Sequence, residues 1–196
     1  MRLTSDAFLD GGEIPRECGY KNGNEKPELV LTEIPKGTMS LALIMDDPDA
    51  MGAVGKVWVH WVMWNIRSNT AAIGNDSANG TEGMTDFGEV GYGGPAPPDK
   101  RHTYVLKLYA LNNMLDLPKE STKAEVEKAM EGHILEQATL TGTYAPDWDR
   151  TVEWTLDVED KKKIKECNGK YWFTCTRCLR LLVEDLRDIV RRPKDD

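Results

Sequence analysis

The chain has 196 residues and a formal net charge of −8, from 33 acidic and 25 basic side chains. The acidic excess lies in residues 1–146, which hold 21 acidic and 13 basic residues, and this balance argues against nucleic acid or an anionic membrane as a partner. No run approaches 18 apolar residues and the N-terminus lacks a signal-peptide core, so we expect a cytoplasmic protein without membrane-spanning segments.

Most of the elements predicted before residue 146 are strands. Short apolar runs bounded by Gly and Pro are typical of β-structure. Five such runs span residues 28–31, 38–45, 57–66, 104–111 and 134–144. Residues 68–98 show little periodicity, and an irregular stretch of that length in a compact domain usually has a functional reason.

One helix is well marked in this part of the chain. Thr122 and Glu125 fit a capping box, an apolar stripe follows, and Gly132 ends the pattern. The sequence therefore predicts a mainly β domain over residues 1–146, built of antiparallel sheets with a few peripheral helices.

Residues 147–196 differ from residues 1–146 in their pattern of polar and apolar residues, and they are predicted to form a C-terminal α+β extension. Polar and apolar residues alternate over 151–158, Asn168-Gly169 is typical of a hairpin turn, and residues 179–190 carry an amphipathic helical stripe. Because a large apolar stripe rarely stays in water, we expect the extension to pack on the domain or on a second copy in a homodimer.

The four cysteines are too sparse for a disulfide scaffold, and reduced thiols are predicted. They are Cys18, Cys167, Cys175 and Cys178. A single Cys-x-x-Cys is a weak zinc signal, and Asp and His residues from separate loops serve equally well as hydrogen-bonding partners. We therefore predict neither a metal nor a cofactor.

Two separate segments concentrate chemically useful side chains. The first is Asp46-Asp47-Pro48-Asp49-Ala50 with the nearby Trp58-Val59-His60-Trp61; the second is Gly91 to Pro98 with Arg101-His102-Thr103-Tyr104. Two of the three histidines lie here, beside turn-forming residues. This concentration predicts one pocket built by two loops.

The residue types in these segments suit a small anion. Imidazoles titrate near pH ~6.5 and donate from both nitrogens when charged. The N–H groups of Gly93 and Gly94 could approach an anion closely because no Cβ intervenes. Simpler interpretations are open: Asp47 and Asp49 in a self-bonded turn, and His60 as a core histidine on the same strand face as Trp58.

Taken together, the motifs resemble the phosphatidylethanolamine-binding proteins, also called Raf-kinase-inhibitor-like proteins, in their bacterial and archaeal branch. The resemblance covers residues 1–146. It is carried by Asp47-Pro48-Asp49-Ala50, His60-Trp61, Trp64-Asn65-Ile66, Phe87-Gly88, Gly94-Pro95-Ala96-Pro97-Pro98 and Gly142-Thr143-Tyr144. Thr103 stands where this family often has Arg.

The resemblance implies Greek-key-like connections and non-catalytic binding of a phospholipid head group, phosphate ester or phosphorylated residue, with a regulatory action on a kinase or protease. The predicted ligand-binding residues are Asp47, Asp49, Trp58, His60, Gly94, Pro97, Pro98, His102 and Tyr104. Two alternatives are open: an enzyme that uses His60 and His102 for acid–base chemistry, and an interaction module with a vestigial pocket.

Overall fold

The computed structural model describes residues 1–74 and 80–146, which belong to one compact unit. The predicted extension over residues 147–196 lies outside the described residues, and its elements and its docking stay predictions. No helix in the described part is long and apolar enough to cross a bilayer.

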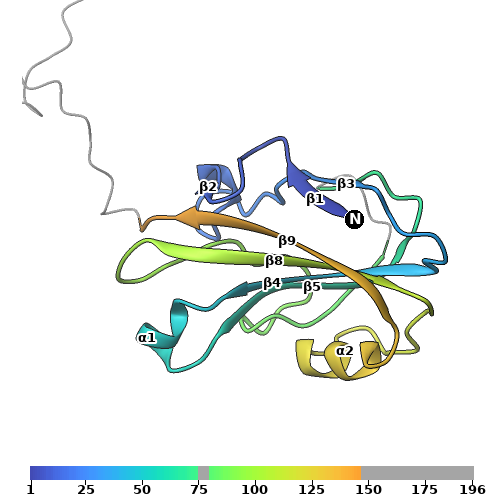
Figure 1. Cartoon of the computed structure of the whole chain (residues 1–196). Coiled ribbons are helices and arrows are strands. Elements are labelled where there is room, and N and C mark those ends of the chain that lie inside the picture. The colour runs from blue at the N-terminus through green and yellow to red at the C-terminus, as the bar shows by residue number, and fades with distance from the viewer. Residues whose placement is uncertain (75–79, 147–196) are drawn as a thin grey trace, which may run out of the picture. The chain divides into compact units, whose positions relative to one another are not determined.

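Six strands form the larger sheet, which dominates the fold (Figure 1). In spatial order they are β2 (Gly12–Glu13), β9 (Ile134–Tyr144), β8 (His102–Leu111), β4 (Ser40–Asp47), β5 (Trp58–Arg67) and β7 (Thr81–Glu82). Neighbouring strands are antiparallel, except that β2 runs parallel to β9. The four long strands form the centre of the sheet, and the two edge strands are very short.

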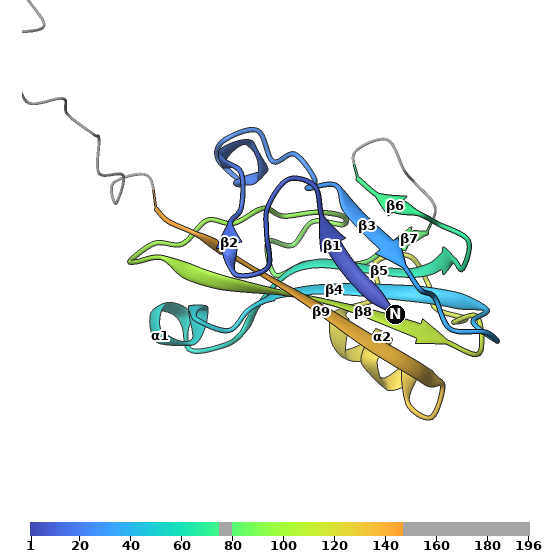
Figure 2. The ribbon, with the colours of Figure 1, turned by 45° about the horizontal axis from the view of Figure 1, so that its top comes forward.

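A smaller sheet and three short helices complete the described part (Figure 2). The sheet contains β1 (Arg2–Ser5), β3 (Leu29–Thr32) and β6 (Ala72–Ile73), all paired antiparallel. The helices are the 3-10 turn η1 (Arg16–Cys18), α1 (Ala50–Val54) and α2 (Lys123–Met130). Figure 1 shows β1 and β3 on one side of the larger sheet and α2 on the other.

Alternation along the strands gives the larger sheet two buried faces. One core lies between the two sheets and includes Leu3, Leu31, Leu43, Trp61, Leu106 and Leu140. The other lies between the larger sheet and α2 and includes Ile44, Val62, Trp64, Leu111, Val126 and Met130. A sheet covered on both faces explains why the strand runs are so apolar.

The predicted mainly β fold is confirmed, and all five predicted strands are present. The β9 strand has the predicted bounds, and the other four differ by one or two residues at their ends. The capping box at Thr122 also forms, with the Glu125 carboxylate accepting the Thr122 N–H. The strands β1, β2, β6 and β7 and the helix α1 were not predicted, because so few residues carry no periodicity.

Candidate functional site

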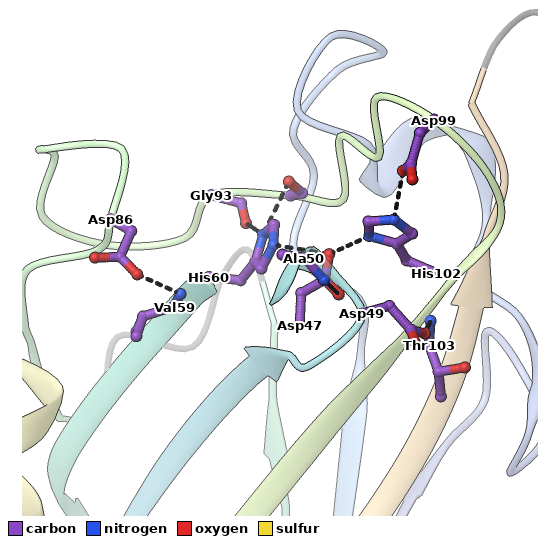
Figure 3. A network of polar contacts seen from close by, with 11 residues as sticks. Asp47, Asp49, Ala50, Val59, His60, Asp86, Gly93, Asp99, His102 and Thr103 are labelled. Carbon is purple, nitrogen blue, oxygen red and sulfur yellow. Dashed lines mark hydrogen bonds and ion pairs between the residues drawn. The ribbon is translucent and has the colours of Figure 1, made fainter. Parts of the chain in front are cut away.

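The polar residues from the two chemical segments meet at one end of the larger sheet (Figure 3). Because β4 is antiparallel to both β5 and β8, its last residue, Asp47, lies beside their first residues. This brings Asp47 to His60 of β5 and to His102 and Tyr104 of β8. We call these four residues the histidine cluster; each is at most 3% exposed.

A β-bulge directs His60 into the cluster. Met45 pairs with Trp61, but the next residue of β4, Asp46, pairs with Val59, so His60 is the extra residue. An extra residue interrupts the alternation of side chains. Without the bulge, His60 would face α2 together with Val62. With it, the ring of His60 lies against Tyr104, at 5.1 Å between centroids.

His102 is held between two carboxylates. Its Nδ1 lies 2.7 Å from Asp47 Oδ2 and its Nε2 lies 2.8 Å from Asp99 Oδ1. Burial alone would lower the pKa of His102, but the hydrogen bonds and charges of Asp47 and Asp99 outweigh it and raise that pKa above 6.5. Because an ionised carboxylate only accepts, both ring nitrogens donate and the ring is an imidazolium.

His60, in contrast to His102, is held as a neutral imidazole. Its Nδ1 lies 2.6 Å from the carbonyl oxygen of Gly93 and 3.1 Å from that of Gly94, so Nδ1 carries the hydrogen. Burial lowers the pKa of His60, against the smaller opposing effects of these carbonyls and of Asp47. The neutral ring therefore presents the lone pair of Nε2, which lies 4.0 Å from Asp47 Oδ2.

The two aspartates of the Asp-Pro-Asp turn have different partners. Asp47 Oδ1 accepts the Ala50 N–H at 3.0 Å, which holds the turn and leaves Oδ2 to the cluster. Asp49 Oδ2 instead accepts the Thr103 N–H at 2.8 Å. Asp47 therefore makes the self-bonded turn of the simpler interpretation and also faces the histidines, whereas Asp49 braces the turn against β8.

Tyr104 contributes an unused donor. Its hydroxyl oxygen is buried near the Asp47 carboxylate and the Ala96 backbone, but it forms no hydrogen bond of normal length and angle with any described residue. Burial and the charge of Asp47 raise the pKa of Tyr104, so the O–H keeps its proton. A buried polar group without a partner is uncommon in a folded protein, and it indicates a place where a bound molecule can supply the missing acceptor.

The predicted role of the two glycine N–H groups is wrong in this arrangement. The Gly93 N–H donates to the carbonyl oxygen of His60 at 2.8 Å, and the Gly94 N–H donates to Asn24 Oδ1 at 2.7 Å. Both donors are used within the protein, so neither is available to an anion. Gly94 contributes through its backbone, because its carbonyl oxygen helps to orient His60.

An aromatic group lies beside the cluster. Phe87 stacks on Tyr20 at 4.3 Å between ring centroids and meets the edges of Trp58 at 5.5 Å and His60 at 5.4 Å. Trp58 is half-buried and, like His60, contacts Phe87, which agrees with its predicted place on the His60 side of the strand. In the loop that follows Gly94, Pro97 is buried and Pro98 is exposed.

Sequence reasoning missed three residues that shape the cluster. Asp99 lies three residues before His102, a spacing that allows a local hydrogen bond, but its position in a Pro-rich loop gave no reason to single it out. Asn24 and Phe87 come from segments without periodicity, and only the fold brings them here.

The described residues contain no group of three or more His, Cys, Asp or Glu side chains that could hold a metal ion. Cys18 is buried and free, and burial raises the pKa of its thiol to about 12. The other three cysteines lie outside the described residues.

Comparisons with known proteins cover the same part of the chain. A family model described as "Phosphatidylethanolamine-binding protein" matches residues 4–145. A UPF0098 protein of Methanothermobacter thermautotrophicus is 41% identical over 151 residues, which are 74% of this chain and 98% of that protein. A UPF0098 protein of Chlamydia muridarum is 38% identical, over 75% of this chain and all of that protein.

Solved structures agree with these sequence matches. A phosphatidylethanolamine-binding protein homologue from Chlamydia trachomatis superposes with a TM-score of 0.71 at 34% identity, over 74% of this chain and 97% of that one. YbcL of E. coli, described as a member of the mammalian PEBP family, gives a TM-score of 0.67 at 28% identity, over 73% and 96% of the two chains.

Proposed function

Because this chain belongs to the phosphatidylethanolamine-binding protein family, we propose that its histidine cluster binds a small oxyanion. Phosphate monoesters such as a phosphorylated residue, the phosphodiester of a phospholipid head group, and carboxylates are all such oxyanions. The unpartnered hydroxyl of Tyr104 carries the proposal, since it is a buried donor beside an imidazolium–carboxylate pair.

The remaining polar atoms favour an oxyanion that keeps one proton. His60 Nε2 and Asp47 Oδ2 are both acceptors and lie 4.0 Å apart, so one hydroxyl of a ligand could donate between them. The Tyr104 O–H could donate to a second, unprotonated oxygen. A monoprotonated phosphate ester carries both kinds of oxygen.

A Tyr104→Phe variant tests the proposal directly. Removing an unpartnered buried hydroxyl is close to neutral for stability, so the variant should fold normally and bind less tightly. We expect inorganic phosphate and O-phosphoethanolamine to bind Tyr104→Phe at least about fivefold more weakly than the wild type, as measured by calorimetry, for the loss of one hydrogen bond.

Tyr109→Phe is the matched control, because Tyr109 lies on the same strand and belongs to the core on the opposite face. It should bind both probes like the wild type. If the wild type binds neither probe, or if Tyr104→Phe binds both equally well, the proposal is wrong.

The acid–base alternative has less support in the geometry. Both nitrogens of His102 donate to carboxylates, so His60 Nε2 is the one imidazole lone pair that the cluster offers. We expect phosphate esters to stay intact when incubated with the protein. Hydrolysis that disappears in a His60→Ala variant would favour an enzyme instead. A regulatory action on a kinase or protease stays an expectation from the family.

A further inference from the structure

The Asp99 carboxylate occupies the outer nitrogen of His102. The two partners of that ring differ in their surroundings: the Asp47 side chain is 4% exposed, whereas the Asp99 side chain is 47% exposed. Figure 3 shows Asp99 on the side of His102 away from Asp47. Asp99 lies in the loop between Gly94 and β8, which has no regular secondary structure. Of the two carboxylates that contact the buried His102 ring, Asp99 is therefore the one in contact with solvent.

A carboxylate at this position does what a bound oxyanion would do. It accepts the Nε2 hydrogen of an imidazolium at 2.8 Å, the normal length of a charge-assisted hydrogen bond. Nε2 is also the His102 donor that points away from Asp47. While Asp99 holds it, an external oxyanion has no access to that donor.

The charges around His102 also favour displacement of Asp99 when an anion binds. With Asp47 and Asp99 both ionised around a single imidazolium and a neutral His60, the site carries a net negative charge. Such a site repels an incoming anion. Movement of Asp99 into solvent would leave the neutral Asp47–His102 pair and a free donor.

We propose that Asp99 is an intramolecular stand-in for the ligand, which an external oxyanion displaces from His102 Nε2. This inference rests on the proposed function, because it concerns the same histidine cluster, and it places an oxyanion at the outer nitrogen of His102 rather than between His60 and Asp47. It makes Asp99 a determinant of affinity and selectivity: a ligand must offer His102 an oxygen that is a better acceptor than the Asp99 carboxylate. The anionic oxygen of a monoprotonated phosphate ester meets that condition better than a neutral amide or alcohol.

Variants of Asp99 test the inference in the full-length protein. Asp99→Asn and Asp99→Ala remove the competing charge at an exposed position, so we expect both to fold. Inorganic phosphate should bind each variant about fivefold or more tightly than the wild type at fixed pH and ionic strength, since the binding-competent fraction of the protein rises.

Asp116→Asn is the charge-matched control. Asp116 is exposed and follows the far end of β8, away from His102. It should bind phosphate like the wild type, because it changes the net charge equally without touching the cluster. A phosphate-bound crystal structure of the wild type should also place the Asp99 carboxylate away from His102 Nε2.

The outcomes separate this inference from the function on which it rests. Tighter binding in both Asp99 variants and not in Asp116→Asn supports displacement. If the wild type binds phosphate and the Asp99 variants bind it no better, Asp99 is only a turn residue and the inference is wrong. If no variant and no wild-type sample binds phosphate, the proposed function fails and the inference with it.

Discussion

At the scale of single residues, the cluster shows how partners set the charge of a histidine. His60 and His102 have the same ordinary pKa and are both buried, yet only His102 has carboxylates on both nitrogens. His60 has carbonyl oxygens on one nitrogen, and the nearest carboxylate oxygen, Asp47 Oδ2, lies 4.0 Å from the other nitrogen. Burial therefore determines the state of His60, and the carboxylates determine the state of His102.

This difference predicts two separate titrations. His60 should take up its proton only below pH 6.5, and His102 should lose its proton only above pH 6.5, following the directions of their pKa shifts. The ¹⁵N chemical shifts of the two rings, followed from pH 5 to pH 9, measure both. The chain has three histidines, so a His133→Gln variant leaves only these two rings, and a further His60→Gln variant assigns their signals. Titration of both rings together would contradict the assignment of charges.

The same shifts predict how stability depends on pH. The folded-state pKa of His102 is raised, so its contribution is fully present below the unfolded pKa of ~6.5 and is lost as pH rises through the folded value. The free-energy difference between wild type and His102→Gln should therefore shrink as pH rises above 6.5. Urea unfolding at several pH values measures this difference, and a difference that grows with pH would contradict it.

At the scale of elements, β4 presents a carboxylate to each face of the sheet. Asp47 faces the cluster, and its neighbour Asp46 faces the opposite side, where Oδ2 accepts from Lys107 Nζ at 3.0 Å and Lys123 Nζ at 2.8 Å. The Asp46 side chain is 2% exposed. Because Lys123 is the first residue of α2, this ion pair ties the helix to the sheet.

Removal of both lysines should be more damaging than removal of all three charges. Lys107→Met with Lys123→Met leaves a buried carboxylate unpaired, which costs about 3–5 kcal/mol. Adding Asp46→Asn should recover a large part of that loss, because the buried charge is then gone. Urea unfolding gives the values. Glu33→Gln is the control, since its pair with Arg2 is exposed on both sides and should be worth less than about 1 kcal/mol.

The sequence predicted the elements that have a period and missed those that do not. The β9 strand and α2 follow from alternation and from a capping box, which are local signals. The β2, β6 and β7 strands have two residues each and form because long strands beside them supply partners. The sequence of a two-residue strand gives no sign of the strand with which it will pair.

The features of the site also include some that the sequence predicts and some that it does not. His60, His102 and Asp47 could be singled out by residue type and by family resemblance, and the fold brings them together. The β-bulge at His60 could not be predicted, since counting by twos places that residue on the face of Val62. The use of the Gly93 and Gly94 N–H groups was predicted wrongly, because their partners, His60 and Asn24, depend on tertiary structure.

At the scale of the whole molecule, the loop before β8 rests on the N-terminal region. A Cβ at Gly94 would lie 2.0 Å from the carbonyl oxygen of Cys18. The Tyr20 N–H also donates to the carbonyl oxygen of Pro95 at 3.0 Å. The position of the site loop thus depends on residues that are more than seventy positions earlier in the chain.

A Gly94→Ala variant should therefore lose both stability and ligand binding. The new methyl group meets backbone rather than a movable side chain, so we expect a loss of about 3 kcal/mol or more, in the upper range for strain from overpacking. Thermal unfolding with and without phosphate measures both effects. Gly52→Ala is the control: it lies in α1 with nothing within 4 Å of a new Cβ, and should be neutral or slightly stabilising.

The pairing of β2 with β9 has a consequence for synthesis on the ribosome. Arg16 donates to the carbonyl oxygen of Ala145, 129 residues later, and Gly12 lies beside Gly142. At translation rates of about 5–20 residues per second, the N-terminal segment waits roughly 6–26 s for this partner. A nascent chain stopped before residue 134 has no β9, so β2 then has no strand to pair with. Because His102 pairs with Tyr144, the histidine cluster is therefore expected to reach its folded arrangement late in synthesis, after β9 has left the ribosome.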